Sequence, residues 1–166
     1  MRARALLCAA LAGFAAPAVA QRNLPPPTLP YDVAFEATLV PTERLARARL
    51  RMGPNQVDRM VFRIDPERHT NVRGDGKLVV EGRSAIWEPP RAGGSLRYDF
   101  RVDKLRNASA YDARISEQWA ILRGGDLFPA ARVLAADGSF SRSTLRLRVP
   151  EGWSIAVFCQ WPSLAG

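Results

Sequence analysis

The sequence predicts an all-β fold, an antiparallel β-sandwich of about nine short strands with at most one short helix. Apolar and polar residues alternate along most of the chain, and alternation with a period of two is typical of half-buried strands. Glycine, proline, asparagine and aspartate separate the alternating runs at intervals of roughly 8–15 residues, which favours a sandwich or barrel over βαβ units. The arginines on the polar sides of these runs protect sheet edges against pairing with other chains.

The clearest strands are three runs in the first two thirds of the chain. Residues 31–40 place Val33, Phe35 and Ala37 on one face and end at a proline. Residues 45–52 alternate apolar side chains with arginine, and residues 95–102 alternate leucine, tyrosine, phenylalanine and valine with charged residues. Further strands are expected at residues 60–64, 77–80, 84–87, 119–122 and 132–134.

Two hairpins are expected in the last third of the chain. Residues 143–149 direct two leucines and a valine to the core and Arg146 and Arg148 to solvent. A proline and a glycine at positions 150 and 152 then reverse the chain, so that residues 153–157 return as a second strand. Asp137 and Gly138 form the turn of another hairpin, between residues 132–134 and the strand that starts at Phe140.

Two regions have weaker patterns. Residues 65–76 are expected to form a polar loop, and the Arg-Gly-Asp tripeptide at 73–75 is interpreted as turn chemistry rather than an integrin signal. Between residues 107 and 129, Ser109 can cap a short helix with Ile115 and Trp119 four residues apart, or residues 119–122 can form a strand. We favour a short helical or irregular piece followed by a strand, with a loop at residues 124–126.

The ends of the chain predict a secreted protein. Residues 1–20 have the charged head, short apolar run and small-x-small cleavage site of a signal peptide cleaved after Ala20, which predicts a periplasmic or extracellular, bacterial protein. Cys8 lies within the apolar run, so we do not expect a lipid anchor. Residues 21–30 form a Pro-rich lead-in, residues 31–158 the sandwich domain, and residues 159–166 a tail whose abrupt end favours truncation. No later segment is long and apolar enough to predict a membrane span.

Charge and cysteine content narrow the function classes. Cleavage removes Arg2 and Arg4 and lowers the formal net charge from +8 to +6. The positive residues are nearly all arginines dispersed over many strands, so we expect no nucleic-acid partner; a solvated sheet face and a surface for an anionic partner both stay open. Cys159 is the one cysteine left in the mature chain, which excludes an internal disulfide and predicts a small core or near-terminal residue.

Residues for catalysis are scarce. His69 is the single histidine, so the sequence provides neither a zinc-hydrolase motif nor a serine triad, and we expect His69 to be a loop or surface residue. Glu117 and Asp126 are the carboxylates that a glycosidase would pair. We therefore assign no catalytic, cofactor or metal residue.

Aromatic and basic side chains provide the candidates for a ligand surface. Tyr111 and Trp119, together with Trp87, have the character of a carbohydrate or peptide groove, although aromatic residues also fill sandwich cores. Arg146 and Arg148 lie on the polar side of a strand. The candidate ligand-surface residues are Arg146, Arg148, Tyr111 and Trp119.

Two segments carry a family resemblance. The run Tyr-Asp-Val-Ala-Phe at 31–35 follows a Pro-rich lead, and residues 144–153 read Thr-Leu-Arg-Leu-Arg-Val-Pro-Glu-Gly-Trp. With the many short strands between them, they resemble the N-terminal β-domain of secreted metallopeptidases of the glycyl aminopeptidase family. The resemblance implies a following zinc catalytic domain, but the His-Glu-x-x-His helix has no counterpart here, so no catalytic residue and no zinc ligand is carried over.

Three functional hypotheses follow from the sequence. The first is a non-catalytic accessory domain that packs beside an aminopeptidase-like catalytic domain and shapes access of a peptide substrate. The second is a free-standing periplasmic module that binds anionic envelope glycans or lipid headgroups through its arginine-rich sheet face. The third, a carboxylate-based hydrolase, depends on Glu117 and Asp126.

Overall fold

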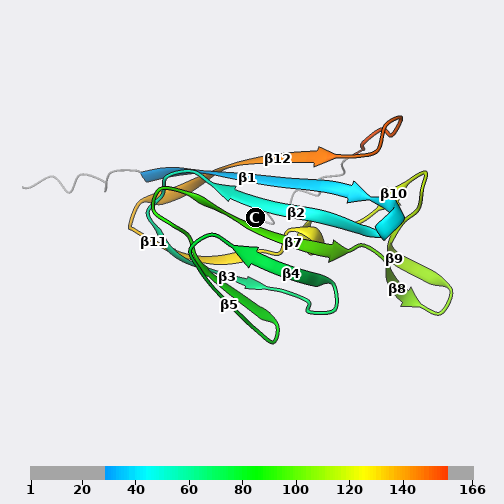
Figure 1. Cartoon of the computed structure of the whole chain (residues 1–166), viewed down its shortest axis with the longest axis horizontal. Coiled ribbons are helices and arrows are strands. Elements are labelled where there is room, and N and C mark those ends of the chain that lie inside the picture. The colour runs from blue at the N-terminus through cyan, green and yellow to red at the C-terminus, as the bar shows by residue number, and fades with distance from the viewer. Residues whose placement is uncertain (1–28, 157–166) are drawn as a thin grey trace, which may run out of the picture.

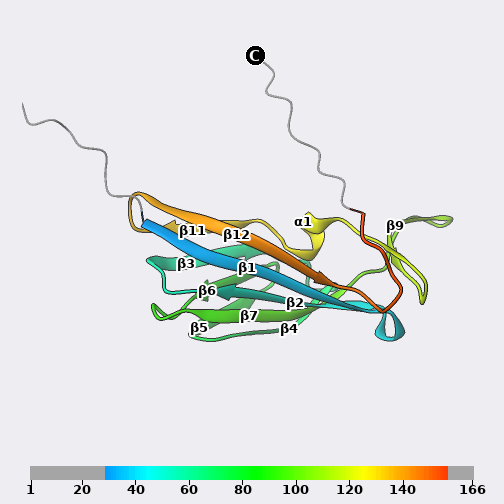
Figure 2. The same cartoon turned by 90° about the horizontal axis from the view of Figure 1, so that it is seen from above.

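The computed structural model describes residues 29–156, which fold as two packed β-sheets with a small third sheet at one end (Figures 1 and 2). The all-β sandwich is thereby confirmed. The predicted signal peptide, nearly all of the Pro-rich lead-in, Cys159 and the rest of the tail from residue 157 lie outside the described residues.

The larger sheet has five strands. Its order across the sheet is β12 (Ser139–Arg148), β1 (Leu29–Val40), β2 (Leu45–Met52), β7 (Gly94–Arg101) and β4 (His69–Gly74), as Figure 1 shows. All neighbours are antiparallel except β12 and β1, which run parallel. Strands that are distant in sequence, such as β2 and β7, therefore lie side by side.

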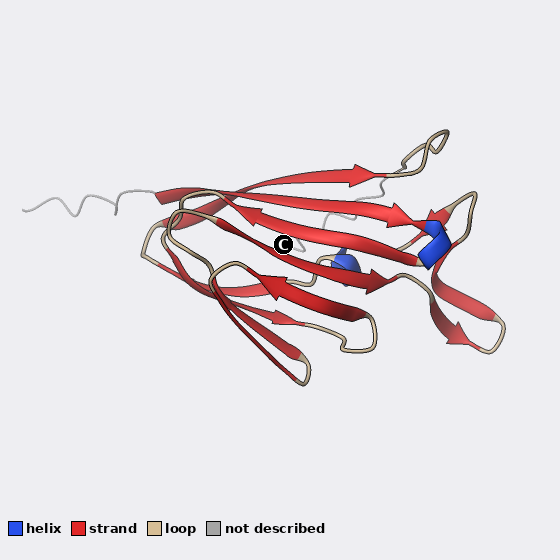
Figure 3. Cartoon of the chain, in the orientation of Figure 1, coloured by secondary structure: helices blue, strands red, loops and turns tan. Residues whose placement is uncertain are grey.

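The second sheet has four strands. A further sheet of three strands lies at one end of the molecule (Figure 1). The four are β11 (Ala131–Ala135), β3 (Val57–Arg63), β6 (Ser84–Glu88) and β5 (Lys77–Glu81). The three are β10 (Ala120–Ile121), β9 (Ala110–Ile115) and β8 (Lys104–Asn107), which we call the arm. Figure 3 distinguishes the two short helical segments, the 3-10 turn η1 (Pro41–Glu43) and the helix α1 (Gly124–Leu127), from the strands.

The core forms where the apolar faces of the strands meet. One cluster surrounds the fully buried Trp87 between the two main sheets, and its indole Nε1 donates a hydrogen bond to the carbonyl of Asp75 at 2.7 Å. A second cluster surrounds the fully buried Phe100 and includes Leu127 of α1 and Ile115 of the arm. The predicted faces of β2 are confirmed. Its arginines point away from the core, and the buried residues are Ala46, Ala48, Leu50 and Met52.

The chain forms twelve strands within residues 29–156, against the nine or so that were expected. Strand β4 lies where residues 65–76 were predicted to be a loop. It pairs with β7 in an irregular register, with a shift between Thr70 and Arg73 and with Asn71 at a φ of 52°. This polar, bulged edge strand has no regular alternation, which is why sequence reasoning missed it.

The region after residue 107 was also assigned wrongly. Asn107 accepts a hydrogen bond from the backbone N–H of Ser109 at 3.0 Å, so Ser109 lies in the turn between β8 and β9 and caps no helix. Burial of Ala113 and Ile115 holds β9 as a strand. The alternative strand within residues 119–122 is confirmed as β10, and the expected loop at 124–126 is the start of α1.

Both predicted hairpins of the last third are wrong. Strands β11 and β12 belong to different sheets, because β11 pairs with β3 and β12 with β1. Residues 153–156 form no strand. Leu145 was expected in the core but is 56% exposed, which fits the position of β12 as the edge strand of its sheet.

A buried polar cluster joins the start of β4 to α1. The Arg68 guanidinium donates from Nη1 to the Asp126 carboxylate at 2.8 Å, and from Nε and Nη2 to the carbonyls of Arg101 and Val102, both at 3.1 Å. It also lies over the Phe100 ring, 4.3 Å from its centroid. The positive charge of Arg68 is thus compensated by its hydrogen-bond acceptors and by the aromatic ring beneath it.

His69 belongs to the same cluster and is buried, contrary to the expected surface position. Its Nε2 lies 3.0 Å from the carbonyl oxygen of Asp126, and its Nδ1 lies against the backbone of Asp65. Burial lowers the pKa of His69 below its ordinary value, which favours the neutral ring. His69 and Arg68 therefore fix the position from which β4 begins.

Candidate functional site

The outer face of the five-stranded sheet gathers arginines from strands that are far apart in sequence. Residues directly opposite each other in neighbouring strands lie on the same face, about 4.8 Å apart from strand to strand. Glu36 of β1 is opposite Arg146 of β12 on one side and Arg49 of β2 on the other. Arg49 is opposite Arg97 of β7, which is opposite Arg73 of β4. We call Arg49, Arg97 and Arg73 the arginine row.

The arginine row opposes the usual rules of sheet stability. Like charges directly opposite each other are destabilising, by roughly 0.2–1 kcal/mol for each pair. Arg97 has an arginine opposite it on both sides. Arg49 donates from Nη2 and Nε to the hydroxyl of Ser95, at 3.0 and 3.3 Å, rather than to a carboxylate. Repulsion of this kind persists in proteins mostly where a site requires it.

Many other basic residues within residues 29–156 are in ion pairs, although six further arginines form none with a described carboxylate: Arg59, Arg63, Arg83, Arg101, Arg114 and Arg132. On the arm, Lys104, Arg106 and Arg123 converge on the carboxylate of Asp112 at 3.3, 3.5 and 2.9 Å. These cations, Lys104 foremost, hold the pKa of Asp112 below its usual value. In contrast, no carboxylate within residues 29–156 lies within ion-pair distance of the arginine row or of Arg148.

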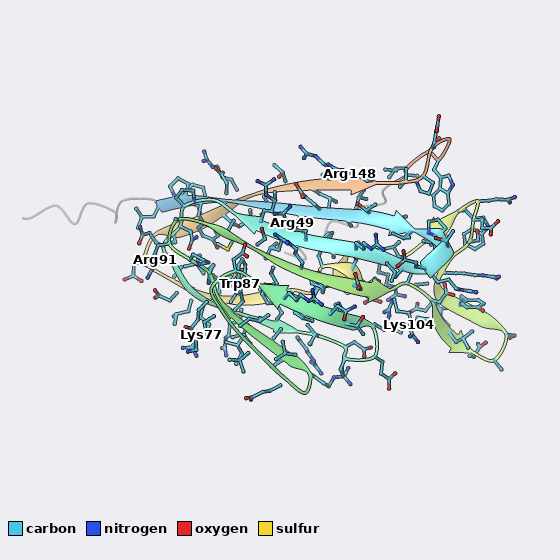
Figure 4. All side chains as sticks on the ribbon, in the orientation of Figure 1. Arg49, Lys77, Trp87, Arg91, Lys104 and Arg148 are labelled. Atoms are coloured by element: carbon cyan, nitrogen blue, oxygen red, sulfur yellow. The ribbon has the colours of Figure 1, made fainter. Side chains whose placement is uncertain are left out.

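A hollow of ≈ 480 Å³ lies over the arginine row. We call it the cationic groove. Five arginines line it: Arg47, Arg49, Arg73, Arg97 and Arg148. Figure 4 labels Arg49 and Arg148, which extend from β2 and β12. Two carboxylates, Glu36 and Asp99, are the acidic residues of the lining, so positive charge predominates and the groove is suited to anionic groups.

A second hollow of ≈ 570 Å³ adjoins the first, since Asp99 lines both. We call it the amphipathic groove. It lies between the end of the five-stranded sheet and the arm, and its lining combines Leu45, Leu105 and Tyr111 with charged residues of both signs. Two of those charges neutralise each other, because Arg44 forms an ion pair with Asp103. We call the two neighbouring grooves together the trough.

Two of the four ligand-surface residues predicted from sequence line this trough. Arg148 lines the cationic groove and Tyr111 the amphipathic groove. Arg146 lies on the same sheet face but is bound to Glu36 at 3.5 Å. Trp119, 48% exposed, lies on the arm near Arg114 and lines neither groove.

The arginine row itself was missed. The alternation placed Arg49 and Arg97 on the polar sides of their strands, but nothing in the sequence indicates that β2, β7 and β4 are neighbours. Arg73 was assigned to a turn. Adjacency of strands that do not follow one another in the chain is set by the packing of the whole domain, not by local patterns.

The carboxylates of the hydrolase hypothesis lie elsewhere. Asp126 belongs to α1 and is bound to Arg68, and Glu117 lies exposed in the turn between β9 and β10. Neither lines the trough. Within residues 29–156, no three histidine, cysteine or acidic side chains are grouped so that they could hold a metal ion. Over the same part of the chain, no helix reaches the length and hydrophobicity that crossing a membrane requires.

Comparison of the whole chain with known proteins gives no matching family model and no curated protein with significant similarity.

Proposed function

We propose that this protein is a binding module, without catalysis of its own, that holds the anionic groups of an extended ligand in the cationic groove. The observation that carries the proposal is the arginine row, three arginines directly opposite one another across β2, β7 and β4, none of which forms an ion pair with a carboxylate of the described residues. A bound anion would relieve the repulsion between the three arginines. The fold has already brought these positive charges together, so binding does not have to assemble them.

Arginine is suited to this role. Its planar guanidinium stays protonated at all physiological pH values and donates two parallel hydrogen bonds to a carboxylate, sulfate or phosphate. Because β-strands hold the side chains at regular intervals, the sheet presents an array rather than a single charge. An array favours a ligand with repeated anionic groups, such as a polymer of the cell envelope.

The dependence of binding on salt tests the proposal. Affinity for a fluorescent oligogalacturonate, measured by anisotropy, is expected to fall at least roughly tenfold between about 50 and about 200 mM NaCl, because salt screens exposed charge pairs and several ion pairs form together. Neutral dextran of similar length is the control and is expected not to bind. Absent binding of every anionic polymer tried, or binding that salt leaves unchanged, contradicts the proposal.

The accessory role beside a catalytic domain stays a prediction. Such a role needs an interface, and the edge strands β11 and β12 expose the apolar side chains that one requires: Val133, Leu134, Phe140 and Leu145. The two roles are compatible, since these residues line neither groove.

A further inference from the structure

The amphipathic groove adds apolar and aromatic contacts to the cationic groove. Tyr111 is 42% exposed and lines the amphipathic groove, while Arg114 lies 4.7 Å from the centroid of its ring. Arg114 does not line the groove, and Tyr111 keeps 42% of its surface exposed despite this contact. Leu45 and Leu105 extend this apolar surface.

The carboxylates of the trough restrict the chemistry of the ligand. Asp99 lies where the two grooves meet, and the hydrogen bond that its side chain accepts among the described residues comes from the amide of Asn71, at 2.7 Å. An ionised carboxylate has about four lone-pair positions and donates nothing. A ligand that passes Asp99 therefore gains contacts there if it brings hydrogen-bond donors as well as negative charge.

Acidic oligosaccharides combine negative charge, hydrogen-bond donors and an apolar ring face in one ligand. Their carboxylate or sulfate groups match the arginine row, their hydroxyl groups can donate to Asp99, and the C–H face of a sugar ring can pack on Tyr111. A polyphosphate has no donors for Asp99. A single-stranded nucleic acid would favour aromatic side chains among the arginines, but Tyr98, the aromatic residue in the cationic groove, is buried with its hydroxyl bound to the Leu127 carbonyl at 2.7 Å.

We infer that the ligand is an acidic glycan that occupies both grooves, with its charged groups on the arginine row and one sugar ring packed on Tyr111. This inference rests on the proposed function and specifies the ligand class of the same site. The inference predicts that the binding free energy has two parts. One depends on salt and comes from the arginine row, and the other is independent of charge and comes from Tyr111 on the arm.

Substitution of Tyr111 separates the two parts. Y111A is expected to weaken binding of oligogalacturonate about tenfold, the effect of losing one aromatic packing surface, without changing the salt dependence. Y111F keeps the ring and is expected to bind like the wild type. Polyglutamate, which has carboxylates but no sugar rings, is expected to bind more weakly than oligogalacturonate and equally to all three proteins.

The outcomes distinguish the ligand class from the proposed function. If Y111A binds oligogalacturonate as tightly as Y111F does, or if polyglutamate or single-stranded DNA of equal charge binds more tightly than oligogalacturonate, the glycan inference is wrong while the proposed function stands. If no polyanion binds the wild type, the proposed function itself fails. Circular dichroism of both variants verifies that the arm substitution leaves the fold intact.

Discussion

R97E is expected to lower the affinity for oligogalacturonate by roughly a hundredfold or more, because it removes one charge-assisted contact and introduces a repulsive one. Arg97 is the middle residue of the arginine row, opposite Arg49 on one side and Arg73 on the other. A glutamate at this position would also bind the two neighbouring guanidinium groups itself. One substitution thus disables the whole row.

The same substitution is expected to stabilise the fold. It converts two like-charge pairs into two opposite-charge pairs, which is worth about 1 kcal/mol in the free energy of unfolding. Urea denaturation measures this as a higher midpoint with an unchanged slope. Stability and binding therefore move in opposite directions, which is typical of a site whose charges are held together at a cost to the fold.

R83E is the matched control. Arg83 is exposed in the turn between β5 and β6, outside both grooves, and the change of charge is identical. It is expected to weaken binding only slightly, through the lower net charge. Equal losses of affinity for R83E and R97E would show that binding follows the overall charge and not the groove.

R68M is expected to destabilise the protein by about 3 kcal/mol, the largest loss that we expect from a single polar residue, because it leaves buried acceptors without a donor. Arg68 is 7% exposed and hydrogen-bonded to Asp126, Arg101 and Val102. Methionine fills similar space but can donate to none of them. Urea denaturation followed by tryptophan fluorescence measures the loss.

R63M provides the comparison for R68M. Arg63 ends β3, is exposed, and forms no ion pair within residues 29–156. Its replacement is expected to change stability by less than about 0.5 kcal/mol. Similar stabilities of R63M and R68M would contradict the assignment of Arg68 as the residue that holds the start of β4, and with it Arg73, in place.

Sequence reasoning identified the strands that repeat a simple pattern. In β1, β2 and β7 the inward side chains are buried in one or other of the two core clusters, so alternation alone reveals the strand. It failed at β4, where a bulge interrupts the alternation, and at β9, whose buried residues pack against α1 and the sheet end instead of a facing sheet. The Asp-Gly turn before β12 predicted a hairpin, but a turn signal does not determine whether the next strand joins the same sheet.

The candidate site was predictable to a smaller extent. Arg148 was identified because it lies on the polar side of a predicted strand, and Tyr111 because an aromatic side chain is suited to line a groove. The arginine row was not, because its members come from β2, β4 and β7, which are separated in the chain by β3, β5 and β6 of the four-stranded sheet. The arginines are dispersed in the sequence, and their clustering can be recognised only once the order of strands in the sheet is known.

The position of the anion on the protein tests the central claim most directly. Arginine Nε–Hε NMR signals, assigned through single arginine-to-lysine variants, can be followed while oligogalacturonate is added to the isotope-labelled protein. The signals of Arg49, Arg73, Arg97 and Arg148 are expected to shift together and to saturate at one ligand concentration, while those of Arg63 and Arg83 stay in place. Shifts of equal size at all exposed arginines, or shifts confined to arginines outside the cationic groove, would contradict it.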